Sequence, residues 1–187
     1  MRKQLFLVGS AMLIGLSGCG TEKSNENSMN DMDEPKLEDI KIDPNSTVGK
    51  VPVNLKEAAN PTFQVGSEAI VKADHMKGME GAVATIVGAY DTTAYVISYT
   101  PVNGGTRVEN HKWVIQEEMK DVDDKNVAPG TEVTIEADHM KGMKGALAEV
   151  VSSEKTTVYM INYTPTTGGD EVINHKWVTE SELSAKE

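Results

Sequence analysis

The chain contains a duplicated unit, and this duplication constrains its fold more than any other feature of the sequence. The heptapeptide Ala-Asp-His-Met-Lys-Gly-Met occurs at residues 73–79 and returns unchanged at 137–143. The tetrapeptide Asn-His-Lys-Trp occurs at 110–113 and returns at 174–177, at the same offset of 64 residues. A copy this close predicts two versions of one small fold in tandem.

Each repeat has the pattern of β structure. We expect four strands in the first repeat, at 68–74, 82–90, 92–100 and 107–115. The third of these is rich in β-branched and aromatic residues, and its period of two places Tyr95, Ile97 and Tyr99 on one face. Several short strands in a unit of about 60 residues predict a small barrel near the lower size limit for a stable core. The order of strands around a Lys-Gly-x-x-Gly loop resembles SH3-like barrels of the KOW type, so the predicted fold is all-β with two tandem barrels.

The N-terminal residues predict export and a lipid anchor. Arg2 and Lys3 precede an apolar stretch, Leu5–Leu16, that is too short to span a bilayer as a helix. The following Leu-Ser-Gly-Cys, ending at Cys19, resembles the lipobox of bacterial lipoproteins, in which the cysteine is lipidated and becomes the new N-terminus. An ordinary secretory signal is the alternative. We therefore predict a membrane-anchored protein on the extracytoplasmic face.

The rest of the chain divides into a tether and the two repeats. Residues 20–60 are polar and acidic, contain Pro35, Pro44 and Pro52 with Pro61 just beyond, and have too few apolar side chains to fold alone. We therefore predict a disordered tether at 20–60, a first β-barrel repeat at 61–121 and a second at 122–187, after a signal peptide at 1–19.

Composition excludes several classes of function. The net charge of −11 argues against nucleic-acid binding, which depends on Lys and Arg. Cys19 is the single cysteine, so no disulfide forms within the chain and no thiol remains in the folded part. No nucleophile elbow or phosphate-binding loop is present, so we do not expect an enzyme.

The paired signatures, together with the lipobox, resemble the YdhK family of bacterial surface lipoproteins, a domain of unknown function found in pairs. The resemblance covers nearly all of the chain beyond the tether. One branch of this family is the copper-tolerance lipoprotein CopL. The resemblance implies extracytoplasmic Cu(I) binding that lessens copper toxicity, with a copper-exporting ATPase as a candidate partner. We expect a monomer that is attached to the lipid bilayer through acylated Cys19.

The donor chemistry of the repeated motifs agrees with this implication. Thioether sulfur is soft and neutral, so it favours Cu(I), or its mimic Ag(I), over Zn²⁺, Ca²⁺ or Mg²⁺. The implied ligands are His75, Met76, Met79 and His111 in the first repeat, and His139, Met140, Met143 and His175 in the second. The alternative for each methionine pair is core packing, since methionine commonly fills gaps in small barrels.

Four further residues have two interpretations each. Trp113 and Trp177 either cover a bound cation or fill the barrel core, and we favour the core. Asp74 and Asp138 either orient the neighbouring imidazoles or end a strand. The alternative function is a surface module that binds peptide or protein without metal, but it leaves the histidines and methionines unexplained.

Overall fold

The structure is a computed structural model and describes residues 50–122 and 127–186. The predicted signal peptide, Cys19 and most of the tether lie outside these residues. The elements are β1 (Glu68–Val71), β2 (Val83–Tyr99), β3 (Val108–Ile115), the 3-10 helix η1 (Gln116–Glu118), β4 (Glu132–Thr134), β5 (Leu147–Tyr163), β6 (Val172–Thr179), the 3-10 helix η2 (Glu180–Glu182) and β7 (Leu183–Ala185). The all-β prediction is confirmed. Within the described residues, no helix has the length and apolarity needed to cross a membrane.

The two longest strands, β2 and β5, organise the fold. They pair antiparallel along nearly their whole length, from Ala84 opposite Tyr163 to Tyr99 opposite Ala148. The sequence predicted two strands separated at Asp91, whereas β2 continues through that residue. Asp91 faces Thr157 on β5 and accepts a 2.9 Å hydrogen bond from its hydroxyl. β-Branched threonines on both strands here favour extended backbone over a turn.

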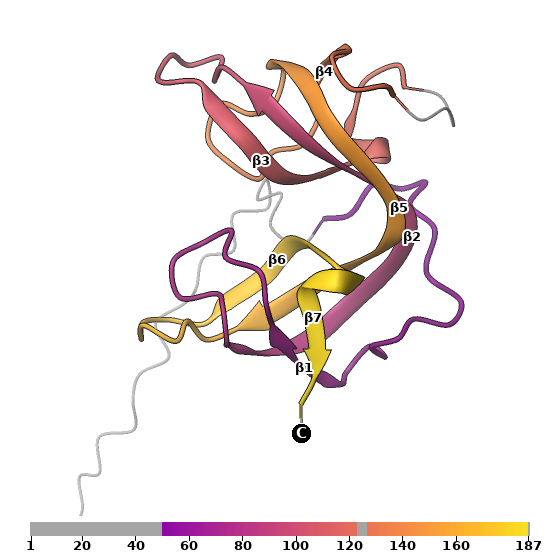
Figure 1. Cartoon of the computed structure of the whole chain (residues 1–187), viewed down its shortest axis with the longest axis vertical. Coiled ribbons are helices and arrows are strands. Elements are labelled where there is room, and N and C mark those ends of the chain that lie inside the picture. The colour runs from indigo at the N-terminus through magenta and orange to yellow at the C-terminus, as the bar shows by residue number, and fades with distance from the viewer. Residues whose placement is uncertain (1–49, 123–126, 187) are drawn as a thin grey trace, which may run out of the picture. The chain divides into compact units, whose positions relative to one another are not determined.

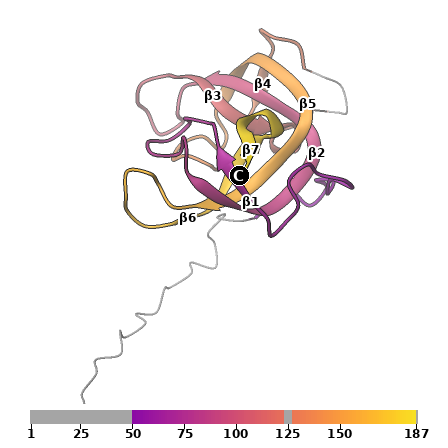
Figure 2. The same cartoon turned by 60° about the horizontal axis from the view of Figure 1, so that its bottom comes forward.

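Because β2 and β5 cross the whole molecule, each barrel takes strands from both repeats (Figure 1). Barrel A consists of β1, the N-terminal half of β2, the C-terminal half of β5, β6 and β7. Barrel B consists of β4, the N-terminal half of β5, the C-terminal half of β2 and β3. The last position of barrel B is filled by a bridge between Met119 and Ile135, equivalent to the pairing of β7 with β1. Figure 2 shows β7 and β1 side by side next to the C-terminus.

The hydrophobic cores confirm this exchange between repeats. The core of barrel A contains Ala69 and Ile86 from the first repeat together with Tyr159 and Tyr163 from the second. The core of barrel B likewise contains residues of both repeats. The structure therefore differs from the expectation of one barrel within 61–121 and another within 122–187. The physical reason is that β2 continues through Asp91 and β5 through the equivalent Lys155, so that the second half of each repeat lies in the other barrel.

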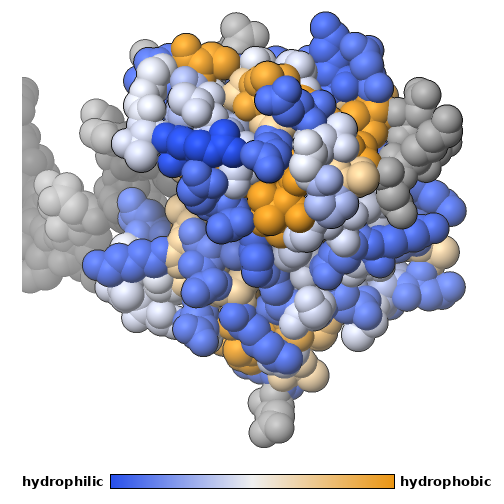
Figure 3. Space-filling view, turned by 45° about the horizontal axis from the view of Figure 1, so that its top comes forward, coloured by the Kyte–Doolittle hydropathy of each residue, from blue (hydrophilic) through white to orange (hydrophobic). Residues whose placement is uncertain are grey.

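A third core lies between the barrels and includes both tryptophans, Trp113 and Trp177. Val51 and Leu55 pack against it, and residue 57 forms a bridge with Tyr90. Residues 50–60, which were expected to belong to the tether, are thus partly packed on the domain. Outside these cores, Figure 3 shows a mostly hydrophilic face on which apolar residues form separate patches.

Candidate functional site

The repeated heptapeptides form loops that lie against the opposite repeat. In the first loop, the amide of Met79 donates to the carbonyl of Met76 (3.1 Å), and Gly78 has a φ of +80°. The Gly78 carbonyl accepts a 2.8 Å hydrogen bond from the amide of Thr166 in the second repeat. A Cβ at Gly78 would lie 2.5 Å from the Thr167 hydroxyl, so only glycine permits both the turn and this close approach.

The turn separates the two methionines of each heptapeptide. Met79 is fully buried in the core of barrel A, and Met143 occupies the same place in barrel B. Met76 and Met140, by contrast, are 49% and 48% exposed. Of the four methionines predicted as ligands, Met79 and Met143 therefore pack as core residues, while Met76 and Met140 remain available as donors.

A cavity of about 670 Å³ brings all four histidines together. The donors that line it are His75, Met76, His111, His139, Met140 and His175. Asp74 and Asp138 also line it. The sequence identified every histidine of this cavity but did not predict that both repeats share it.

The histidines are paired across the repeats. The ring centroids of His75 and His175 lie 6.5 Å apart, and those of His111 and His139 lie 6.3 Å apart. The sequence predicts instead that His75 acts with His111, within one repeat. The exchange of strands explains the difference, because β6 of the second repeat lies in the same barrel as the first heptapeptide loop.

Each pair has one exposed thioether beside it. The hydroxyl of Tyr163 lies 3.9 Å from the Met76 sulfur, and the Tyr163 ring packs edge-on against His175 at 5.8 Å. Tyr99 makes the same contacts to Met140, at 3.9 Å, and to His111, at 6.1 Å. The cavity thus holds two equivalent donor groups, each with two imidazoles and one thioether.

One nitrogen of every histidine is buried without a hydrogen-bond partner among the described residues. These atoms are Nδ1 of His75 and His139 and Nε2 of His111 and His175. Buried polar atoms are nearly always paired, so four unpaired nitrogens on the histidines that line one cavity require an explanation. Within 50–122 and 127–186, no group of three or more His, Cys, Asp or Glu side chains is arranged to hold a metal.

Burial and mutual repulsion disfavour the charged form of two of these imidazoles. Burial, followed by the charges of His139 and His75, lowers the pKa of His111 from 6.5 to about 4 against the opposing effect of Glu118. Burial and the other three histidines lower the pKa of His175 to about 4 in the same way. At neutral pH both rings are uncharged and can donate a lone pair.

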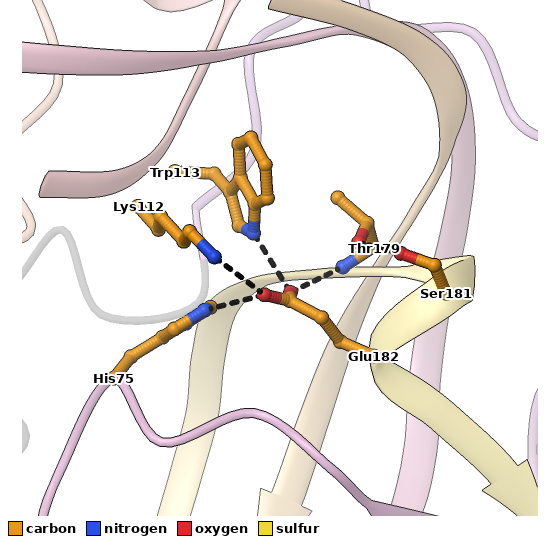
Figure 4. Close-up of polar contacts among 6 residues, drawn as sticks. All are labelled: His75, Lys112, Trp113, Thr179, Ser181 and Glu182. Atoms are coloured by element: carbon orange, nitrogen blue, oxygen red, sulfur yellow. Dashed lines mark hydrogen bonds and ion pairs between the residues drawn. The ribbon is translucent and has the colours of Figure 1, made fainter. Parts of the chain in front are cut away.

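Two glutamates that the sequence analysis did not select complete the site. Glu182 accepts a 2.8 Å hydrogen bond from Nε2 of His75 and a 2.7 Å bond from Nε1 of Trp113 (Figure 4). Glu118 makes the equivalent bonds to His139 (2.8 Å) and Trp177 (3.0 Å). Their offset of 64 residues was the available signal, because it marks them as a repeated polar pair.

These contacts also distinguish between the two interpretations of Trp113, Trp177, Asp74 and Asp138. Trp113 and Trp177 pack in the third core, as favoured, and each donates its indole N–H to a glutamate; the Trp113 ring also lies edge-on to His75, with centroids 6.5 Å apart. Asp74 and Asp138 line the cavity, but the carboxylates hydrogen-bonded to His75 and His139 are those of the glutamates.

The two donor groups differ in their surroundings. Lys176 lies 3.7 Å from Glu118, above the ring of Trp177, and donates a 2.8 Å hydrogen bond to the carbonyl of Lys50. Its side chain is only 11% exposed. Lys112, the equivalent residue beside Glu182, is 45% exposed. The segment that precedes the first repeat therefore covers one of two otherwise equivalent lysines.

The sequence matches the family described as "Protein of unknown function (DUF1541)" twice, over residues 65–116 and 129–180. It is 56% identical over 176 residues to the "Uncharacterized protein YdhK" of Bacillus subtilis (strain 168), covering 94% of this chain and 85% of that protein.

Solved structures of the same B. subtilis protein are similar in fold. A crystal structure at 2.00 Å shares 66% identity over 73% of this chain and 93% of that chain, with a TM-score of 0.72. A solution NMR structure of its C-terminal domain shares 68% identity over 66% of this chain and 94% of that chain, with a TM-score of 0.64.

Proposed function

The chain belongs to the DUF1541 family, and we propose that it is an extracytoplasmic, lipid-anchored protein that binds Cu(I) in the cavity shared by its two repeats. The observation that carries this proposal is the set of four buried imidazole nitrogens without partners. An unpaired buried donor or acceptor destabilises a fold by about 1–3 kcal/mol, so four of them on residues that line one cavity favour a ligand that satisfies them.

The donors fit a soft monovalent ion. His75, His175 and Met76 would hold one Cu(I), and His111, His139 and Met140 would hold another. Neutral imidazole and thioether suit Cu(I), whereas a closed Zn²⁺ site takes four ligands drawn from thiolate, imidazole and carboxylate. When bound, the ion would supply a Lewis-acid partner for each bare nitrogen.

Sequestration is the role that fits this site and the anchor predicted at Cys19. A protein held at the outer face of the membrane would bind Cu(I) before it reaches other targets, and so contribute to copper tolerance. Ligation by thioether and imidazole favours the reduced ion. A copper-exporting ATPase would be a source of the metal.

Anaerobic Cu(I) titration against a competing chelator tests the proposal. The Cys19→Ser chain serves as the reference, because the lone thiol is itself a soft ligand. We expect two Cu(I) ions per chain, bound tighter than micromolar, and Ag(I) binding at the same sites. Absence of binding at this level would contradict the proposal and leave the peptide-binding alternative.

Two methionines in each repeat provide a matched control. Met76→Leu and Met140→Leu preserve volume and apolarity but remove sulfur, so each should lower the affinity for one of the two Cu(I) ions. Met79→Leu and Met143→Leu make the same chemical change in the barrel cores and should leave both affinities unchanged. Equal effects of the two pairs would show that the exposed sulfurs are not ligands.

A further inference from the structure

Each glutamate beside the cavity is surrounded by N–H donors. In addition to His75 and Trp113, Glu182 accepts a 3.1 Å hydrogen bond from the amide of Thr179, and Nζ of Lys112 lies 3.7 Å away (Figure 4). This lysine approaches Oε1, the same Glu182 oxygen that accepts the hydrogen bond from His75. The carboxylate is therefore held by its own 3-10 turn and by β3 of the other repeat before any ligand binds.

The hydrogen bonds to the two carboxylates come from N–H groups. Glu182 accepts from His75, Trp113 and the amide of Thr179, and Glu118 accepts from His139 and Trp177. Each glutamate is therefore the acceptor toward its histidine. An acceptor at 2.8 Å from Nε2 requires that Nε2 carries the proton.

This requirement fixes the tautomer of the neutral imidazole. With the proton on Nε2, the lone pair lies on Nδ1, which is the buried and unpaired nitrogen of His75 and of His139. In His111 and His175 the unpaired nitrogen is instead Nε2. Each pair across the repeats therefore presents one Nδ1 and one Nε2.

We propose that Glu182 and Glu118 are positioning residues, each of which fixes one histidine in its Nε2–H tautomer and directs Nδ1 toward the metal. The inference rests on the proposed Cu(I) binding and adds the identity of the coordinating atoms. Glu182 of the second repeat serves His75 of the first, and Glu118 of the first serves His139 of the second. Each metal group therefore depends on both repeats for its orientation as well as its donors.

The tautomer can be read directly in the metal-free, nitrogen-15-labelled chain by long-range ¹H–¹⁵N correlation NMR of the imidazoles. We expect His75 and His139 as Nε2–H tautomers. The Nδ1–H tautomer at either residue would overturn the proposal, whether or not any variant folds. Since no metal is present, this result is independent of the Cu(I) titration, which alone decides the proposed function.

The matched variants Glu182→Gln and Glu118→Gln test the positioning role. An amide cannot accept from both the imidazole and the indole at two equivalent oxygens, so one donor loses its acceptor. Glu182→Gln should shift His75 to a mixture of tautomers and leave the tautomer of His139 unchanged. It should also lower the affinity for one of the two bound Cu(I) or Ag(I) ions by about 10- to 100-fold. Glu118→Gln should give the converse.

A purely structural role would give a different result. The variant would then lower the melting temperature through the lost Trp113 contact, while the tautomer of His75 and both metal affinities stayed as in the parent chain. That outcome would overturn the proposal.

Discussion

The lowered pKa values of His111 and His175 make the stability of the metal-free protein depend on pH. In the unfolded chain each imidazole binds a proton near pH 6.5, but in the folded chain only near pH 4. Between these values the unfolded state binds more protons, so stability falls as pH falls. The stabilisation is present above pH 6.5 and is lost progressively as pH approaches 4.

The magnitude follows from the shift. At 1.36 kcal/mol for each pKa unit, a decrease from 6.5 to about 4 gives a limit of about 3.4 kcal/mol for each histidine. At pH 5 the loss relative to pH 8 is about 2 kcal/mol for each, or about 4 kcal/mol for both. A domain of ordinary stability has about 5–15 kcal/mol in total, so this change is readily measured.

Urea unfolding at pH 8 and pH 5, in the presence of a chelator, provides the assay. The His111→Gln/His175→Gln double variant is the control, because it removes both titrating rings and keeps all other ionisable side chains. We expect the parent chain to lose about 4 kcal/mol more than the control between the two pH values. An equal loss in both proteins would refute the reasoning that burial and mutual repulsion lower these pKa values.

Three further predictions follow from packing. Cleavage at a protease site inserted between Val122 and Val127 should yield two fragments that still elute together in size-exclusion chromatography, because each core contains residues of both repeats. Separation of the fragments would contradict the strand exchange. Met143→Ala should lower the free energy of unfolding by about 2–5 kcal/mol, since Met143 is fully buried, and a loss below about 1 kcal/mol would show that it is not core. Lys176→Met should destabilise by about 1–3 kcal/mol and Lys112→Met by less than about 1 kcal/mol, because only Lys176 is covered; equal effects in urea unfolding would contradict this.

Local pattern was sufficient to predict the secondary structure class and the donors. The period of two through Tyr95, Ile97 and Tyr99 correctly placed these side chains in one core. The repeat itself selected all four histidines, which line one cavity. These features depend on neighbours in sequence, so sequence reasoning reaches them.

The pairing between repeats depends on one junction that local pattern does not determine. Turns at Asp91 and at the equivalent Lys155 would have closed each repeat on itself, whereas the continuous strands place the second half of each repeat in the other barrel. Both arrangements bury the same apolar faces, so hydrophobic periodicity does not distinguish them. The same choice decides that His75 lies beside His175 and that Glu182 reaches it.

The sequence also did not show that Met76 lines the cavity while Met79 packs in the core. Both lie in one heptapeptide, and a helical turn would have directed them to the same side. The loop instead turns at Gly78, which sends Met79 into the core and leaves Met76 at the cavity. Burial in a loop of this kind is set by its tertiary contacts rather than by spacing.

Cu(I) titration of two double variants tests most directly whether the metal groups are built across the repeats. His75→Ala/His175→Ala removes both imidazoles of one proposed group, so the chain should retain one Cu(I) at full affinity. His75→Ala/His111→Ala removes one imidazole from each group, so both ions should bind more weakly. The reverse result, with one intact ion in the second variant and two weakened ions in the first, would show that each repeat binds metal alone and would contradict the shared site.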